Sequence, residues 1–169
     1  KNSPASNYND VLFAWRGPYD QGHDFEFEDK NIEVKSRSIG NSSVKITNEG
    51  QLQQLEGKGL ELSVVTLERD QFTGQTLKEL TQDIVRIVEV GLGDTSVLYS
   101  ALRQKNLGLH NLSSYDDLAF RAVKLVDYDC LKDAFPRIIR SELPDAIFGL
   151  KYSLNTAELE DFIIEEIEL

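Results

Sequence analysis

Short hydrophobic stretches alternate with polar residues over the first two fifths of the chain. Residues 11–15 are a continuous apolar run that ends at Arg-Gly-Pro, which predicts a buried strand followed by a turn. Residues 24–28 and 32–36 alternate with a period of two, which is the pattern of half-buried strands. Residues 43–47 and 60–67 are rich in β-branched residues and predict two more strands, the second of them central.

The pattern then changes to the period of a helix. Apolar residues recur every three or four positions from Thr76 to Gly91, and the glycine marks the end of the predicted helix. Asn48, with Gln51 three residues later, predicts another helix through a capping box. We also expect helices at 96–105 and 157–167, and strands at 122–126, 135–139 and 146–154. This mixture predicts an α/β or α+β fold with a central mixed sheet.

Composition and charge limit the function classes. The 169 residues suit a single domain, 1–169, and carry 18 basic and 29 acidic side chains, a net charge of −11. Residues 1–58 hold seven of the basic and nine of the acidic ones, so most of the excess acidity lies downstream, including an acidic helix expected within 155–169. A protein that binds nucleic acid by charge alone is normally basic, so tight unaided binding is excluded.

The few cysteines and histidines exclude other chemistry. One cysteine, Cys130, cannot form an internal disulfide, which predicts a reducing compartment, the cytoplasm. Two histidines and one cysteine are too few for a structural zinc site. The longest apolar runs are far shorter than a membrane span. We expect Trp15 and Cys130 to be core residues.

The candidate chemistry lies in the predicted hairpin. If residues 24–28 pair with 32–36 across Asp29-Lys30, one face carries Phe25, Phe27, Ile32 and Val34 and enters the core. The other face then carries Asp24, Glu26, Glu33 and Lys35. Crowded carboxylates attract a hard cation such as Mg²⁺, for which Asp24, Glu33 and the carbonyl of Val34 would be ligands. Lys35 would orient or deprotonate an attacking water.

Asp24 and Glu33-Val34-Lys35 resemble the D-x(n)-(D/E)-x-K signature of the PD-(D/E)XK nuclease superfamily. Flanking blocks over residues 11–154 resemble a bacterial family of PD-(D/E)XK motif proteins found near restriction and anti-phage defence genes. These blocks are Trp15-Arg16-Gly17-Pro18, His23-Asp24-Phe25, Glu33-Val34-Lys35-Ser36, Gln51-Leu52 and Phe135-Pro136-Arg137.

The resemblance implies a restriction-endonuclease-like core and a metal-dependent endonuclease acting on DNA within a restriction or defence system. It implies Mg²⁺ or Mn²⁺ at Asp24 and Glu33, with Lys35 as catalytic lysine and Gln51 as an auxiliary polar residue on a following helix. The expected partners are DNA and other defence subunits such as an ATPase, with a homodimer as a further option. The superfamily core starts with a helix that carries an acid. Only Lys1 to Asp10 precede the predicted first strand, which suggests a missing N-terminal segment or a missing ligand.

Other interpretations stay open. Alternating Glu and Lys is also the pattern of a solvated strand surface, and Gln51 could simply cap its helix. A catalytically inactive interaction module is the main alternative to a nuclease. Glu28-Asp29-Lys30 and Glu56-Gly57-Lys58 also fit E-x-K but fall at turns. Basic residues that could contact the DNA backbone are Arg16, Lys30, Arg37 and Lys45. A shared ion requires the carboxylates of Asp24 and Glu33 to approach within about 5 Å.

Overall fold

A computed structural model describes residues 8–20, 22–108 and 110–169, and the chain forms two compact units. The first unit comprises residues 1–27 and 68–121, and the second comprises residues 28–67 and 122–169. The chain passes between them after Phe27 and within strands β4 (Gly59–Arg69) and β6 (Ala119–Asp129). The fold is mixed α+β, in agreement with the predicted class. The single domain expected over 1–169 stays a prediction.

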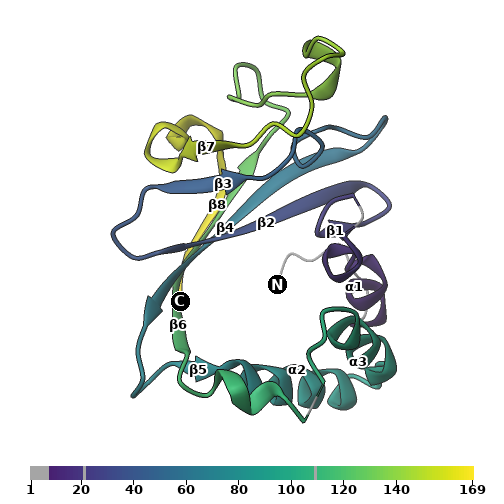
Figure 1. Cartoon of the computed structure of the whole chain (residues 1–169), viewed down its shortest axis with the longest axis vertical. Helices are drawn as coiled ribbons and strands as arrows, with labels where there is room; N and C mark the ends of the chain where they lie inside the picture. The colour runs from purple at the N-terminus through teal and green to yellow at the C-terminus, as the bar shows by residue number, and fades with distance from the viewer. Residues whose placement is uncertain (1–7, 21, 109) are drawn as a thin grey trace. The chain divides into compact units, whose positions relative to one another are not determined.

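The second unit contains the motif strand. Strand β2 (Lys30–Ser38) runs parallel to β4, with Asn31 opposite Leu60 and Lys35 opposite Val64. Strand β4 is hydrogen-bonded on its other side to β6, and β8 (Ile163–Glu168) pairs antiparallel with β6. Strands β3 (Ser43–Ile46) and β7 (Tyr152–Asn155) form a separate antiparallel pair. Figure 1 shows β2, β4 and β6 as long neighbouring strands.

Alternating apolar residues on β4 form the centre of this unit's core. Leu60, Leu62 and Val64 are each at most 1% exposed and pack with Val44 and Ile46 of β3. Residues two apart on a strand share a face, so the alternation of β4 directs these three side chains together. Strands β3, β4 and β6 confirm the predicted strands at 43–47, 60–67 and 122–126.

The first unit contains the α-helices of the described chain: α1 (Tyr8–Ala14), α2 (Leu77–Val90) and α3 (Thr95–Gln104). A capping box between Thr76 and Glu79 begins α2, and the Asp94 side chain accepts from the Ser96 N–H to begin α3. Both helices occur where the sequence predicts them. The core residues are Leu12, Val88, Leu98 and Leu102, with Trp15 packed against them. The short strands are β1 (Phe25–Glu26) and β5 (Gln75–Thr76).

The predicted strand at 11–15 is wrong, because Tyr8–Ala14 form helix α1. Leu12 faces the core at 7% exposure whereas Phe13 is 58% exposed, which a helix allows in a continuous apolar run. The helix carries Asp10 in its first turn. The expectation that the residues before the motif are too few for a helix is therefore also wrong.

The predicted acidic helix within 155–169 is wrong as well. The segment forms two 3₁₀ turns, η4 (Thr156–Glu158) and η5 (Glu160–Phe162), and then strand β8. Pairing with β6 places Glu166 beside Lys124, whose Nζ lies 2.8 Å from the glutamate Oε1. This tertiary contact and the pairing of Ile163 with Tyr128 override the local preference for a helix.

Three smaller expectations also fail. Residues 135–139 do not form a strand, and of residues 146–154 only the end belongs to β7. Residues 48–55 form turns in place of a helix. The remaining 3₁₀ turns are η1 (Gly17–Tyr19), η2 (Leu112–Tyr115) and η3 (Arg140–Glu142).

Candidate functional site

A stripe of polar side chains runs along one face of β2. Asn31, Glu33, Lys35 and Arg37 alternate along the strand and lie opposite Leu60, Leu62, Val64 and Thr66 of β4. Asn31 is fully buried and Glu33 is 2% exposed. Ile32 and Val34, which were expected to enter the core, are only half-buried. On β2 the expected burial of the two faces is thus reversed, because the polar stripe shares its face with the apolar residues of β4, whereas Phe25 and Phe27 of the expected core face are half-buried.

Glu33 and Lys35 form a largely buried ion pair. The Lys35 ammonium donates to Glu33 Oε1 at 2.5 Å, and the two side chains are 15% and 2% exposed. Charge attraction is stronger away from water, and a buried carboxylate requires a cation or hydrogen bonds to be tolerated. The second half of the predicted motif therefore has its acid and its lysine in contact.

Asp24 lies in the first unit, directly before β1. Its carbonyl accepts from the backbone N–H groups of Arg16 and Gly17, at 2.8 and 3.1 Å. A Cβ on Gly17 would lie 2.5 Å from Asp24 Oδ1, so any other residue at position 17 would displace the Asp24 carboxylate. Two of the sequence blocks, 15–18 and 23–25, are thus brought into contact. The approach of the Asp24 carboxylate to Glu33 stays a prediction, since the two residues belong to different units.

Gln51 does not lie on a helix. Its Oε1 accepts from the backbone N–H of Thr47 at 2.7 Å, and Asn48 Oδ1 accepts from the N–H of Gly50 at 2.9 Å. The Asn48–Gln51 pattern therefore signals a stabilised turn after β3, in place of the predicted helix N-terminus. Leu52, which follows it, is fully buried in the core of the second unit.

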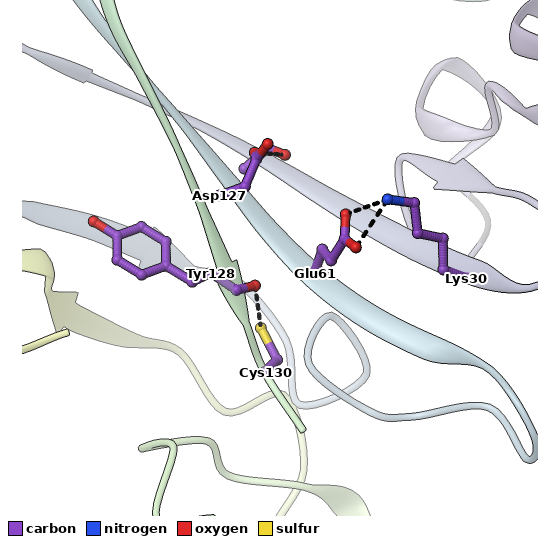
Figure 2. A network of polar contacts seen from close by, with 6 residues as sticks. Lys30, Glu61, Asp127, Tyr128 and Cys130 are labelled. Carbon is purple, nitrogen blue, oxygen red and sulfur yellow. Dashed lines mark hydrogen bonds and ion pairs between the residues drawn. The ribbon is translucent and has the colours of Figure 1, made fainter. Parts of the chain in front are cut away.

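Two of the four predicted DNA-contacting cations are held by partners inside the second unit. Lys30 Nζ lies 2.6 Å from Glu61 Oε2, as Figure 2 shows. Arg37 donates to the hydroxyls of Thr66 and Thr156, at 3.1 and 2.9 Å. Of the other two, Arg16 lies 4.0 Å from Glu26, and Lys45 is exposed on β3. In the alternative Glu28-Asp29-Lys30 motif, the lysine therefore has an ion-pair partner from outside the motif.

The opposite face of β4 carries polar residues that sequence reasoning missed. Glu61 and Ser63 alternate with the buried leucines and so point away from them. Ser63 Oγ donates to Asp127 Oδ1 of β6 at 2.5 Å, and Figure 2 places Asp127 on the same side as the Lys30–Glu61 pair. The spacing of Glu61 and Ser63 on a strongly apolar strand was the signal that could have found them.

Cys130 is confirmed as a core residue. It has no exposed surface, and its Sγ approaches the carbonyl oxygen of Tyr128 at 4.0 Å. Burial raises the pKa of the thiol, while the charge of Arg137 acts in the opposite direction. The thiol is therefore protonated at neutral pH and is not a nucleophile.

The donor atoms of the motif suit a hard divalent cation. Among the described residues, no three His, Cys, Asp or Glu side chains gather into a group that could hold a metal ion. The predicted set is smaller than that: the two carboxylates of Asp24 and Glu33, and the carbonyl of Val34. All of these donors are oxygens, as Mg²⁺ requires, and Mg²⁺ typically keeps several waters in addition.

The family model described as "Putative PD-(D/E)XK family member, (DUF4420)" matches residues 2–157. The chain belongs to this family. Comparisons with curated proteins and with solved structures found no match. Membership confirms the resemblance seen in the sequence and assigns the chain a nuclease-like fold. Proteins of the PD-(D/E)XK type generally use divalent metals and act on DNA. Among the described residues, no helix is long and apolar enough to cross a membrane.

Proposed function

We propose that this PD-(D/E)XK family member is a metal-dependent endonuclease that hydrolyses DNA phosphodiester bonds. The observation that carries the proposal is the Glu33–Lys35 pair, in which a nearly buried carboxylate and an ammonium meet at 2.5 Å on the motif strand. Such a pair is costly to bury, and the family's chemistry gives a reason for keeping it. We further propose that the protein serves as a cytoplasmic subunit of a restriction or anti-phage defence system.

The proposed roles follow the motif. Asp24, Glu33 and the carbonyl of Val34 would hold Mg²⁺ or Mn²⁺, and the bound ion would supply Lewis acidity at the scissile phosphate. Lys35 would orient the attacking water and offset negative charge that develops on the phosphate oxygens. Gln51 is the proposed auxiliary polar residue. Its carboxamide nitrogen keeps two donors in addition to the oxygen that accepts from Thr47.

The net charge favours a partner that delivers the DNA. The net charge is −11, and Lys30 and Arg37 are held by side chains of the second unit. Affinity for DNA rests mainly on cations that contact phosphates, so this chain alone would bind DNA weakly. We therefore propose that another defence subunit, such as an ATPase, or a second copy of the chain presents the DNA.

A catalytically inactive interaction module is the second candidate. The observation that favours it is the low exposure of the motif pair, 2% for Glu33 and 15% for Lys35. An ion pair that is mostly closed to solvent can serve structure alone, and a net charge of −11 suits binding of basic protein partners. This candidate predicts that the chain cuts no DNA with any divalent ion.

Plasmid nicking separates the two candidates. Supercoiled plasmid is incubated with the protein and Mg²⁺ or Mn²⁺, with EDTA as the blank. We expect cleavage by the wild type, its loss in Lys35→Ala, and wild-type cleavage in Lys58→Ala. The last variant is a matched control, since Glu56-Gly57-Lys58 has the same spacing but falls at a turn. Equal cleavage by wild type and Lys35→Ala would refute the assignment, and no cleavage by wild type with its proposed partner present would favour the module.

A further inference from the structure

Asn31 is a buried amide without hydrogen-bond partners. It lies two residues before Glu33 on β2 and has no exposed surface. Neither its Oδ1 nor its Nδ2 has a hydrogen-bond partner. Folded proteins pair nearly all of their buried polar side-chain atoms, so an asparagine with both atoms unpaired requires a reason.

The strand neighbour of Asn31 is an apolar residue of the core. Leu60, its neighbour on β4, is 1% exposed, and the Leu60 carbonyl accepts from the N–H of Cys130 at 3.0 Å. Cys130 is itself fully buried. A leucine in place of Asn31 would lose no side-chain hydrogen bond. Packing alone therefore does not explain why an amide stands at this position.

Asn31 shares its face of β2 with the motif pair. Same-face neighbours on a strand are about 6.6 Å apart, so Asn31 and Lys35 flank Glu33 from its two sides. Lys35 contacts Oε1 of Glu33, and Asn31 occupies the same-face position on the N-terminal side of Glu33. An amide offers an acceptor and two donors, which are the groups that hold a hydrated ion in place.

We propose that Asn31 is a positioning residue of the cation site at Glu33, where its carboxamide hydrogen-bonds the water around a bound divalent ion. The inference rests on the proposed function, since it concerns the same site. Residues that hold the surroundings of a metal typically change its affinity about 10–100-fold when they are replaced. The unpaired atoms of Asn31 would thus obtain their partners when the cation binds.

Calorimetric titration of the full chain with Mn²⁺ tests this inference. We expect Asn31→Leu to weaken Mn²⁺ binding by at least about tenfold. Asn31→Asp, which keeps the size and an acceptor oxygen, should bind at least as well as wild type. Asn111→Leu is the matched control and should not change the affinity. Asn111 also has a buried side-chain oxygen without a partner but lies in the first unit.

Stability measurements separate a positioning role from a structural one. In EDTA, Asn31→Leu should unfold at a temperature no lower than wild type, because leucine removes an unpaired buried amide. The loss of affinity then does not come from loss of folding. If Asn31→Leu does not fold, Asn31→Ala takes its place in the same titration, with the same criterion. Wild-type Mn²⁺ affinity in the folded variant overturns the inference.

The same titrations distinguish failure of this inference from failure of the proposed function. If wild type binds no Mn²⁺, or if Glu33→Gln leaves the binding unchanged, both ideas are wrong. If Glu33→Gln abolishes the binding but Asn31→Leu does not alter it, only the role of Asn31 is wrong.

Discussion

Replacing Lys35 by methionine should destabilise the second unit strongly, because it leaves the Glu33 carboxylate buried without its cation. Removing one partner of a buried ion pair typically costs about 3–5 kcal/mol. Glu33 is 2% exposed and Lys35 is 15% exposed, which places this pair at the lower end, about 3 kcal/mol. For a chain of this length, that loss corresponds to a fall in Tm of about 6–12 °C.

Urea unfolding in EDTA, followed by far-ultraviolet circular dichroism, measures this loss. Lys30→Met is the matched control on the same strand. The Lys30–Glu61 pair has a similar separation, 2.6 Å, but its side chains are 22% and 21% exposed, so its loss should cost about 1 kcal/mol or less. The unfolding free energy of Glu33→Leu combined with Lys35→Met should lie within about 1 kcal/mol of that of wild type, since apolar residues often replace buried pairs without loss.

Adding Mn²⁺ should restore part of the stability of Lys35→Met. If Lys35→Met proves as stable as Lys30→Met, Glu33 is not a buried charge that needs compensation, and the reasoning about the site fails.

Three further predictions concern other parts of the chain. Gly74→Ala should cost more than about 2 kcal/mol in urea unfolding, because a Cβ there meets the Asp70 carbonyl oxygen and lies 2.8 Å from Phe120 N; an unchanged midpoint would contradict this. The Thr73 hydroxyl, and then the N–H groups of Phe72 and Thr73, hold the pKa of Asp70 below its ordinary 3.8. The contribution of the Asp70 carboxylate to folding stability is therefore fully present above that pH and is lost as the pH falls. Asp70→Asn should accordingly lose less stability than wild type between pH 5 and 3, and equal pH dependence of the unfolding free energy in the two proteins would refute this. Cys130 should react with a thiol reagent only on unfolding, because the thiol is fully buried and its pKa is raised; rapid labelling of the native protein would show otherwise.

The parts of the fold that the sequence predicted correctly have local causes. The helix after Thr76 has its own capping box with Glu79, and the β4 alternation of Leu60, Leu62 and Val64 matches the period of a strand. These signals require no knowledge of distant residues. The motif pair was also predictable, since Glu33 and Lys35 lie two positions apart on one strand and therefore share a face.

The failures have tertiary causes. A run of apolar residues at 11–15 suits a strand or a helix equally, and packing of Leu12 with Leu98 and Leu102 of α3 decides for the helix. The reversal of burial on β2 arose because alternation alone does not say which face meets the core. Polar residues enter a core when partners or ligands compensate them, and Lys35 compensates Glu33 here. No local pattern distinguishes that case from a solvated Glu-Lys surface.

The ion pairs further reduce the affinity for DNA that the acidic composition allows. Ion pairs within 4.0 Å engage at least eight of the 18 Lys and Arg residues, namely Arg16, Lys30, Lys35, Arg86, Lys105, Arg121, Lys124 and Arg140. A cation that is already paired releases fewer counterions when it meets a phosphate, so it contributes less to DNA affinity. On β2, the charges of Glu33 and Lys35 neutralise each other. Under the proposed function, a divalent ion at Glu33 would provide the positive charge next to the phosphate that the chain's own cations do not. DNA binding by this chain should therefore depend on divalent ions, and a protein partner should be needed for the remaining affinity.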